Sequence, residues 1–273
     1  MRKWFSSAMM VVAGIVVVVF SFASLPTAGQ VPASRIPRAP DGKPNLTGLW
    51  QAINSANWDI QDHAARQGPV IALGAAFSVP EGAGVVEGNE IPYRPEALAQ
   101  KKENFSKAMT LDPEVKCFLP GVPRATYMPY PFQIVQSPTT VLIAYEYDNA
   151  SRIVYMNSKE EAAADSWMGW SRGRWEGETL VVDVTGFNDR TWFDRAGNYH
   201  SDALHVIERY TPIDADHLMY EATIEDPKVF TRPWKMSMPL YRRVEKNAQL
   251  GEYLCVEFAE ELMYGSLTKQ TSK

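Results

Sequence analysis

Apolar and polar positions alternate with a period of two through most of the second half of the chain. The alternation defines short runs at residues 132–136, 140–147, 152–157, 173–175, 179–185, 203–211, 217–225, 234–242 and 252–257. A period of two places successive side chains on opposite faces of a strand, and turn residues separate the runs. No apolar run with a helical period intervenes, which argues against parallel βαβ units. The pattern predicts a mainly β fold, an antiparallel up-and-down barrel, since closure removes exposed strand edges.

The first half of the chain carries weaker signals. Residues 45–50 have the pattern of an opening strand, and Pro95, followed by an acid and then lysines, predicts one helix over residues 95–103 that ends before Asp112. We expect residues 30–110 to hold an extended arm, this strand and this helix. Residues 111–265 are expected to form the barrel, in one domain with the preceding segment. A disordered tail is expected over residues 266–273.

The first 29 residues have the composition of a secretory signal peptide. Arg2 and Lys3 form a basic start, an apolar run begins at Ala8, and small residues at 21–23 and 27–29 offer two cleavage sites. The run of about fifteen residues is shorter than the ~20 that span a bilayer. We therefore expect cleavage and no stable membrane anchor, with an uncleaved anchor as the alternative. The predicted location is periplasmic or secreted, in a bacterium.

Export changes the interpretation of the two cysteines, Cys117 and Cys255. An oxidising compartment favours their pairing, so we predict a disulfide; two buried free thiols are the alternative. The net charge of −5 includes no basic block, and nucleic acid is therefore not an expected partner. The sequence does not indicate the oligomeric state.

Three motifs carry a family resemblance. They lie at residues 174–183 (RWEGETLVVD), 186–192 (GFNDRTW) and 200–209 (HSDALHVIER). In these motifs, and around both cysteines, the chain resembles a large family of uncharacterised secreted bacterial proteins, over most of residues 41–255. The resemblance implies an exported relative but no reaction. Separately, Gly48-Leu49-Trp50 resembles the opening strand of lipocalin-like barrels, whose Trp closes one end while the other stays open to ligand; a plain core Trp is the alternative.

Polar and aromatic side chains mix in the long connection at residues 186–202. Trp192 and Phe193 are suited to form a lid over a pocket, with polar groups such as Asn188 facing a ligand. His200 beside Asp202 would form an oriented base, because a carboxylate fixes the imidazole tautomer.

Glu208 lies on the apolar face of its predicted strand. Inside an apolar barrel its pKa would rise through desolvation, and the side chain could act as an acid. In the competing interpretation, Ser201 and Asp202 only cap a turn, and Glu208 pairs with an arginine such as Arg152 or Arg174.

Aromatic residues and methionines also gather in two shorter loops, at residues 127–130 and 167–170. With Tyr130, Trp170 and the nearby His205 at the barrel mouth, such loops suit a flat, apolar ligand. Ordinary loop packing explains them as well. We therefore predict an exported barrel that binds a hydrophobic or aromatic, terpenoid-like molecule in an interior pocket. A cofactor-independent cyclase, isomerase or lyase using His200, Asp202 and Glu208 is the alternative; an envelope interaction protein would need a broad exposed apolar patch.

Two other chemistries receive little support. Residues 169–173 match the G-x-S-x-G nucleophile pattern around Ser171, but a strand follows where that pattern needs a helix. His200, His205 and Glu208 are close in sequence, yet His205 and Glu208 point to opposite faces of one strand. No metal site and no cofactor is therefore predicted.

Overall fold

Nine strands close into a barrel in their sequence order, and the mainly β prediction is confirmed. The computed structural model describes residues 36–68 and 70–268, so the predicted signal peptide lies outside the described residues. The strands are β1 (Gly48–Ala52), β2 (Phe132–Gln136), β3 (Thr140–Tyr145), β4 (Ser151–Met156), β5 (Trp170–Glu176), β6 (Thr179–Thr185), β7 (His205–Pro212), β8 (His217–Glu225) and β9 (Trp234–Arg242).

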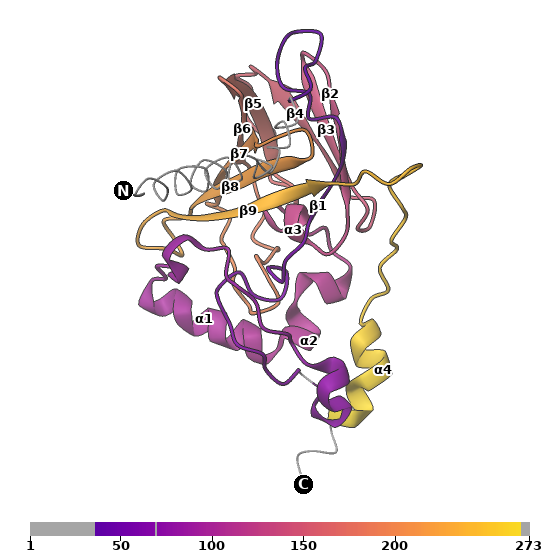
Figure 1. The fold of residues 1–273 in the computed structure, drawn as a ribbon. Helices are drawn as coiled ribbons and strands as arrows, with labels where there is room; N and C mark the ends of the chain where they lie inside the picture. The colour runs from indigo at the N-terminus through magenta and orange to yellow at the C-terminus, as the bar shows by residue number, and fades with distance from the viewer. Residues whose placement is uncertain (1–35, 69, 269–273) are drawn as a thin grey trace, which may run out of the picture. The chain divides into compact units, whose positions relative to one another are not determined.

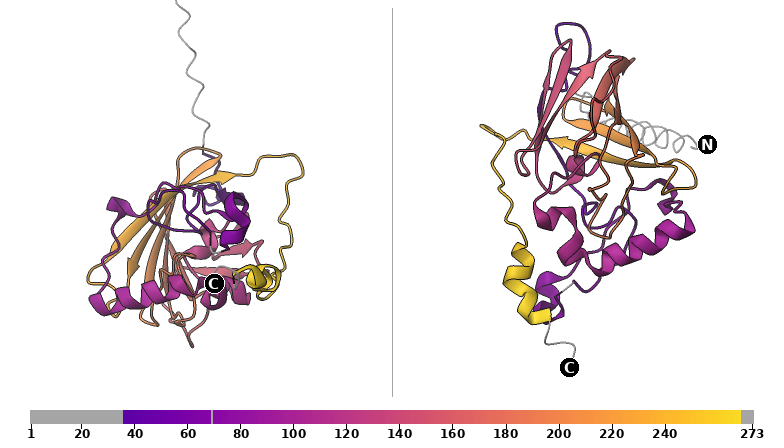
Figure 2. Two further views of the ribbon diagram at one scale, coloured as in Figure 1. Left: turned by 90° about the horizontal axis from the view of Figure 1, so that it is seen from below. Right: turned by 180° about the vertical axis from the view of Figure 1, so that it is seen from behind.

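Helices and turns extend from the end of the barrel where β2, β7 and β9 begin (Figure 1). The helices are α1 (Pro95–Ser106), α2 (Ala108–Leu111), α3 (Arg124–Tyr127) and α4 (Ala259–Thr268), with 3-10 helices η1 (Ile71–Phe77), η2 (Glu87–Asn89) and η3 (Pro113–Lys116). Figure 2 shows α1, α2 and α4 on this same side in a second view. The predicted helix that begins at Pro95, and that was expected to end before Asp112, is confirmed as α1, which ends at Ser106.

One strand pair departs from the predicted antiparallel meander. Within the described residues, eight neighbouring pairs are antiparallel, whereas β4 and β5 are parallel, with Val154 opposite Ser171 and Met156 opposite Gly173. The connection at residues 157–169 is long enough to cross back to the starting end, which a tight hairpin cannot do. The barrel is therefore mixed.

One prediction for the C-terminal part is wrong. Residues 252–257 form no strand and make only an isolated bridge between Tyr147 and Tyr253. Of the segment predicted as a disordered tail, residues 266–268 belong to α4, and residues 269–273 lie outside the described part, so the tail itself stays a prediction. The helix packs on η1 through Tyr264 and Phe77, whose ring centroids are 5.3 Å apart. This contact is distant in sequence, so local patterning could not reveal it.

The Gly-x-Trp triplet has a packing explanation. Trp50 is fully buried and donates its indole N–H to the Leu46 carbonyl at 2.8 Å. The Arg242 guanidinium lies 4.2 Å from the centre of the Trp50 ring. A Cβ at position 48 would collide with that guanidinium, so only glycine fits there.

The barrel centre is filled with side chains. Fully buried inward-facing residues include Phe132, Ile134, Val154, Val182, Val206, Tyr210, Tyr220, Ile224, Met236 and Leu240. Helix α3 adds to this filling: all four of its residues are buried, and Thr126 lies against Tyr145 and Tyr210. The barrel thus has a packed interior with one helix inserted at its end.

Candidate functional site

Glu208 is the centre of a buried ionic cluster inside the barrel. Its inward orientation, predicted from strand alternation, is confirmed by an exposed fraction of 0%. The carboxylate accepts hydrogen bonds from Arg152 Nη1 at 2.6 Å and Nη2 at 2.9 Å. Tyr210 and Tyr220 donate their hydroxyls to it at 3.0 and 2.9 Å. Pairing with Arg152, the competing interpretation, is therefore what the structure shows.

The partners of Glu208 are themselves fully engaged. Arg152 also donates to the hydroxyl oxygens of Tyr145 at 3.1 Å and Ser171 at 3.3 Å. Burial, followed by the negative charge of Glu208, raises the pKa of Tyr210 and Tyr220 well above the ordinary value, so both remain donors. Ser171 is buried within β5 and occupies no nucleophile turn. The cluster is closed to solvent, which suits a structural role.

His200 and Asp202 do not form the predicted base. The imidazole is buried, with Nδ1 2.8 Å from the Ser201 carbonyl and Nε2 2.6 Å from the Thr191 hydroxyl. A carbonyl only accepts, so Nδ1 carries the proton and Nε2 accepts from Thr191. Asp202 instead pairs with Lys228 at the surface, because the turn directs its side chain outward. Burial lowers the pKa of His200, which keeps the ring neutral.

The predicted lid residues belong to the core. Phe193 is buried and packs against His200 and Trp234, with ring centroids 5.5 and 5.6 Å away. Trp192 is also buried. Asn188 accepts from the backbone N–H of Arg190 at 3.2 Å and so stabilises a turn. Both aromatic side chains are therefore buried within the protein and do not form an exposed lid.

The other predicted ligand residues are dispersed over the surface. Trp170 lies on the outer barrel face, stacked on Tyr155 with centroids 4.5 Å apart. His205 lies on that face between Asp183 and Glu225, 3.1 Å from each carboxylate. Tyr130 packs on Tyr253 near the C-terminal segment, at 4.3 Å between centroids. The alternation along a strand predicts which face a side chain lies on, but not which side chains come together in one site. Trp170, His205 and Tyr130 do not form a common site.

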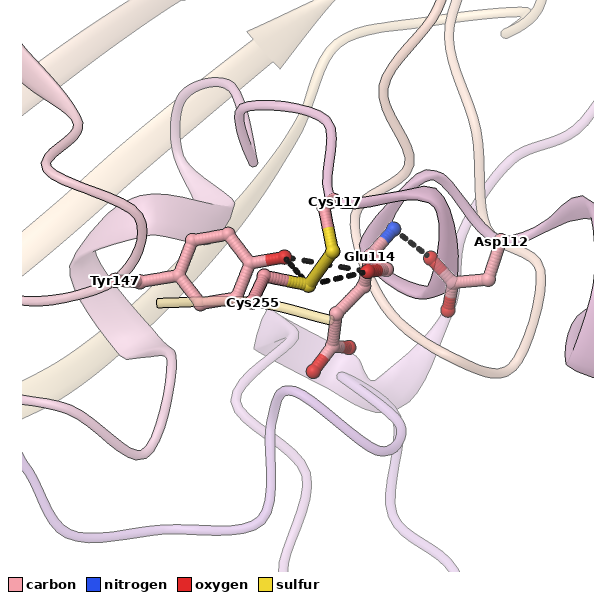
Figure 3. The surroundings of a disulfide bond; sticks show 5 residues. All are labelled: Asp112, Glu114, Cys117, Tyr147 and Cys255. Atoms are coloured by element: carbon pink, nitrogen blue, oxygen red, sulfur yellow. Dashed lines mark hydrogen bonds between the residues drawn. A yellow bond between two sulfur atoms is a disulfide. The ribbon is translucent and has the colours of Figure 1, made fainter. Parts of the chain in front are cut away.

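The predicted disulfide between Cys117 and Cys255 is confirmed (Figure 3). It joins the turn after η3 to the segment that leads into α4. Tyr147 reinforces the junction, since its hydroxyl donates to the Glu114 carbonyl at 3.2 Å and lies 3.6 Å from Cys255 Sγ. Closing so long a loop lowers the conformational entropy of the unfolded chain. The disulfide thereby stabilises the folded state by at most about 4–5 kcal/mol.

A cleft lies outside the barrel, near α1 and α2. It has a volume of about 560 Å³ and is called the base cleft. It is lined by Trp58, Arg66, Gln67, Gly68, Val79, Phe105, Ser106, Lys107, Ala108, Met109, Thr110 and Arg195. Three smaller cavities, of 390, 310 and 400 Å³, border loops and outer strand faces. None of these four is the predicted pocket between the barrel walls.

Several segments from different parts of the sequence form the base cleft. Arg66 and Val79 pair through reciprocal backbone hydrogen bonds of 2.9 Å and form one wall. The junction of α1 and α2, with Phe105 and Lys107, forms another. Phe105 leaves 49% of its surface exposed. A large apolar side chain that stays in water on a polar helix is the local signal for this site, which the sequence analysis missed.

Cations lie directly over the aromatic rings of the base cleft. The guanidinium carbon of Arg195 is 4.4 Å from the Trp58 ring centre, and that of Arg66 is 5.2 Å from the Phe105 ring centre. Such contacts stabilise a cation by about 0.5–2 kcal/mol. The residues lining the cleft in the described part of the chain include no Asp or Glu. The cleft therefore combines apolar walls with positive charge.

A buried carboxylate lies behind the base cleft. Asp194 is fully buried and accepts from the backbone N–H of Ile60 at 2.9 Å and from the Asn198 side chain at 2.6 Å. Burial, and secondly the charge of Asp59, raises its pKa to about 7. Asp59 in turn holds Arg66 of the cleft at 3.1 Å. The charge of Arg66 in the cleft is thus coupled, through Asp59, to the carboxyl group of Asp194, whose pKa is raised to about 7.

Comparisons with known proteins add no relative. The chain matches no protein-family model, and no curated protein matches it. In the described residues, no helix has the length and apolar character needed to cross a membrane. No three His, Cys, Asp or Glu side chains of residues 36–68 and 70–268 are grouped so as to hold a metal ion.

Proposed function

We propose that this protein binds a small hydrophobic or aromatic molecule, and that the binding site is the base cleft. The observation that carries this proposal is a cleft of about 560 Å³ with Trp58, Phe105 and Met109 in its walls. Ligand sites have volumes of roughly 300–1,000 Å³ and mostly apolar walls. A bound ring would cover the exposed face of Phe105 and remove it from water.

The packed barrel favours the cleft over an interior pocket. In a lipocalin-like barrel the ligand would enter at the end opposite the closing Trp. Here α3 and the Glu208 cluster contribute to the filling of the barrel. A lipocalin-like origin, with Trp50 as the core residue of the opening strand, is part of our proposal. An enzyme built on His200, Asp202 and Glu208 is not carried forward, because these side chains do not meet.

Export to the periplasm or beyond is also part of the proposal. It is supported by the composition of residues 1–29, by the resemblance to secreted proteins and by the Cys117–Cys255 disulfide. Expression of the full chain in a Gram-negative host, followed by mass measurement of the periplasmic protein, tests it. Loss of the first 23 or 29 residues is expected; an intact chain retained in the cytoplasm would contradict it.

Binding is tested with the neutral fluorescent probe N-phenyl-1-naphthylamine. We expect saturable fluorescence enhancement, and a loss of affinity of roughly tenfold or more in Phe105→Ala, since an aromatic contact contributes about 1.5–3 kcal/mol. Leu98→Ala is the matched control, because Leu98 is an exposed apolar residue of the same helix outside the cleft. Equal affinity of both variants and the unchanged protein would refute the proposed site.

A further inference from the structure

Two segments that line the base cleft each contribute a cation. Arg66 belongs to the segment paired with Val79, and Lys107 belongs to the α1–α2 junction. The side chain of Arg66 is 32% exposed and that of Lys107 is 54% exposed. Both also line the cavity itself. A molecule held against the aromatic side chains would therefore lie near positive charge from both segments.

The carboxylate partners of these cations lie outside the cavity lining. Asp59 contacts Arg66 through Nη1 at 3.1 Å, and Glu103 contacts Lys107 at 2.7 Å. A guanidinium carries five N–H donors and an ammonium three, so one carboxylate contact does not exhaust either group. Arg195, in contrast, is mostly buried and held by Glu260 at 2.7 Å. Arg66 and Lys107 are thus the two cations of the cleft with capacity for a further anion.

Resting on the proposed function, we infer that the ligand of the base cleft is an anionic aromatic molecule, with a carboxylate or sulfonate on a flat ring system. The rings would lie against Trp58 and Phe105, and the acidic group would accept hydrogen bonds from Arg66 and Lys107. The chain as a whole carries a charge of −5. Attraction of an anion therefore needs a local cationic lining, which a purely neutral ligand would not require.

Two probes that share one ring skeleton distinguish the contribution of the ring system to binding from that of the acidic group. The anion 1-anilinonaphthalene-8-sulfonate differs from N-phenyl-1-naphthylamine by its sulfonate group. We expect the sulfonate to bind the exported, processed protein roughly tenfold more tightly than the neutral probe at low salt, as charge-assisted hydrogen bonds provide. Raising the salt concentration should weaken the binding of the sulfonate, because salt screens its charge, and should leave the affinity for the neutral probe unchanged.

Charge-removing variants locate the effect. Lys107→Gln and Arg66→Gln are each expected to weaken sulfonate binding by roughly fivefold and neutral-probe binding by less than about twofold. Lys235→Gln is the matched control, since Lys235 is exposed on the outer face of β9 and away from the cleft lining. Lys107→Gln is expected to leave the fold intact, because the ion pair of Lys107 with Glu103 lies at the surface. A change in its binding therefore does not come from misfolding.

The outcomes distinguish the two proposals. If neither probe binds, the proposed function itself fails. If both bind with equal affinity and the charge variants change neither, the cleft is a binding site but the anionic ligand is refuted. A sulfonate preference that persists unchanged in both Lys107→Gln and Arg66→Gln would also overturn the inference, because the anion would then be held elsewhere.

Discussion

The barrel centre and the base cleft use the same kinds of residue for different ends. In each, an arginine pairs with a carboxylate and lies close to aromatic side chains, although the carboxylates of the cleft arginines lie outside its lining. In the centre, Arg152 and Glu208 form several hydrogen bonds with buried tyrosines and are closed to solvent. In the cleft, Arg66 lies over the exposed ring of Phe105, beside a cavity. Residue type alone does not mark a functional site; access to solvent and unused bonding capacity do.

The largest effect on the free energy of unfolding is expected at the barrel centre. Glu208→Ala should lower the free energy of unfolding by about 3–5 kcal/mol, because it leaves the Arg152 charge buried without its partner. Urea unfolding followed by tryptophan fluorescence measures this. The double variant Arg152→Met with Glu208→Leu should recover part of the loss. A loss below about 1 kcal/mol in the single variant would show that the centre is not sealed.

An intermediate effect is expected from Asp194, behind the cleft. Its pKa in the folded protein is raised to about 7, so the folded state binds the proton more tightly than the unfolded chain. Stability is therefore fully present below the unfolded pKa of about 4 and is lost as pH rises through about 7; between about pH 5 and pH 8 the loss is roughly 2–3 kcal/mol. The slope of unfolding free energy against pH, between about pH 5 and pH 8, measures this linkage.

Asp194→Asn provides the control for that slope. The variant should lose this pH dependence whatever its absolute stability, because the titrating group is gone. The buried His200 acts in the opposite direction, since its lowered pKa makes the fold less stable as pH falls. The difference between the two proteins at each pH removes the contribution of His200. A profile identical in both would contradict the assignment.

The smallest stability effect is expected at the cleft wall. Phe105→Ala, the variant that should weaken ligand binding most, should change the free energy of unfolding by less than about 0.5 kcal/mol, as is usual at exposed positions. Thermal unfolding without ligand measures it. A large loss would mean that Phe105 supports the fold, which would remove the contrast between centre and cleft.

Much of the barrel could be predicted from local pattern. β2, β6, β8 and β9 have the bounds that alternation and turn residues indicate, and Glu208 has the predicted orientation. The direction of β5 could not be predicted, because a period of two is the same for parallel and antiparallel neighbours. Helix α4 was missed because exposed apolar residues such as Leu262 and Met263 interrupt an amphipathic pattern.

The sequence by itself indicated most of the strands and their inner and outer faces, and it favoured the pairing of Cys117 with Cys255, since each depends on local periodicity or on the chemistry of one residue type. Only the tertiary structure decided which polar groups are sealed and which face a cavity. Trp58, Phe105 and Arg195 are far apart in the chain, and their proximity follows from how connections pack below the barrel. Such long-range packing leaves no periodic trace in the sequence.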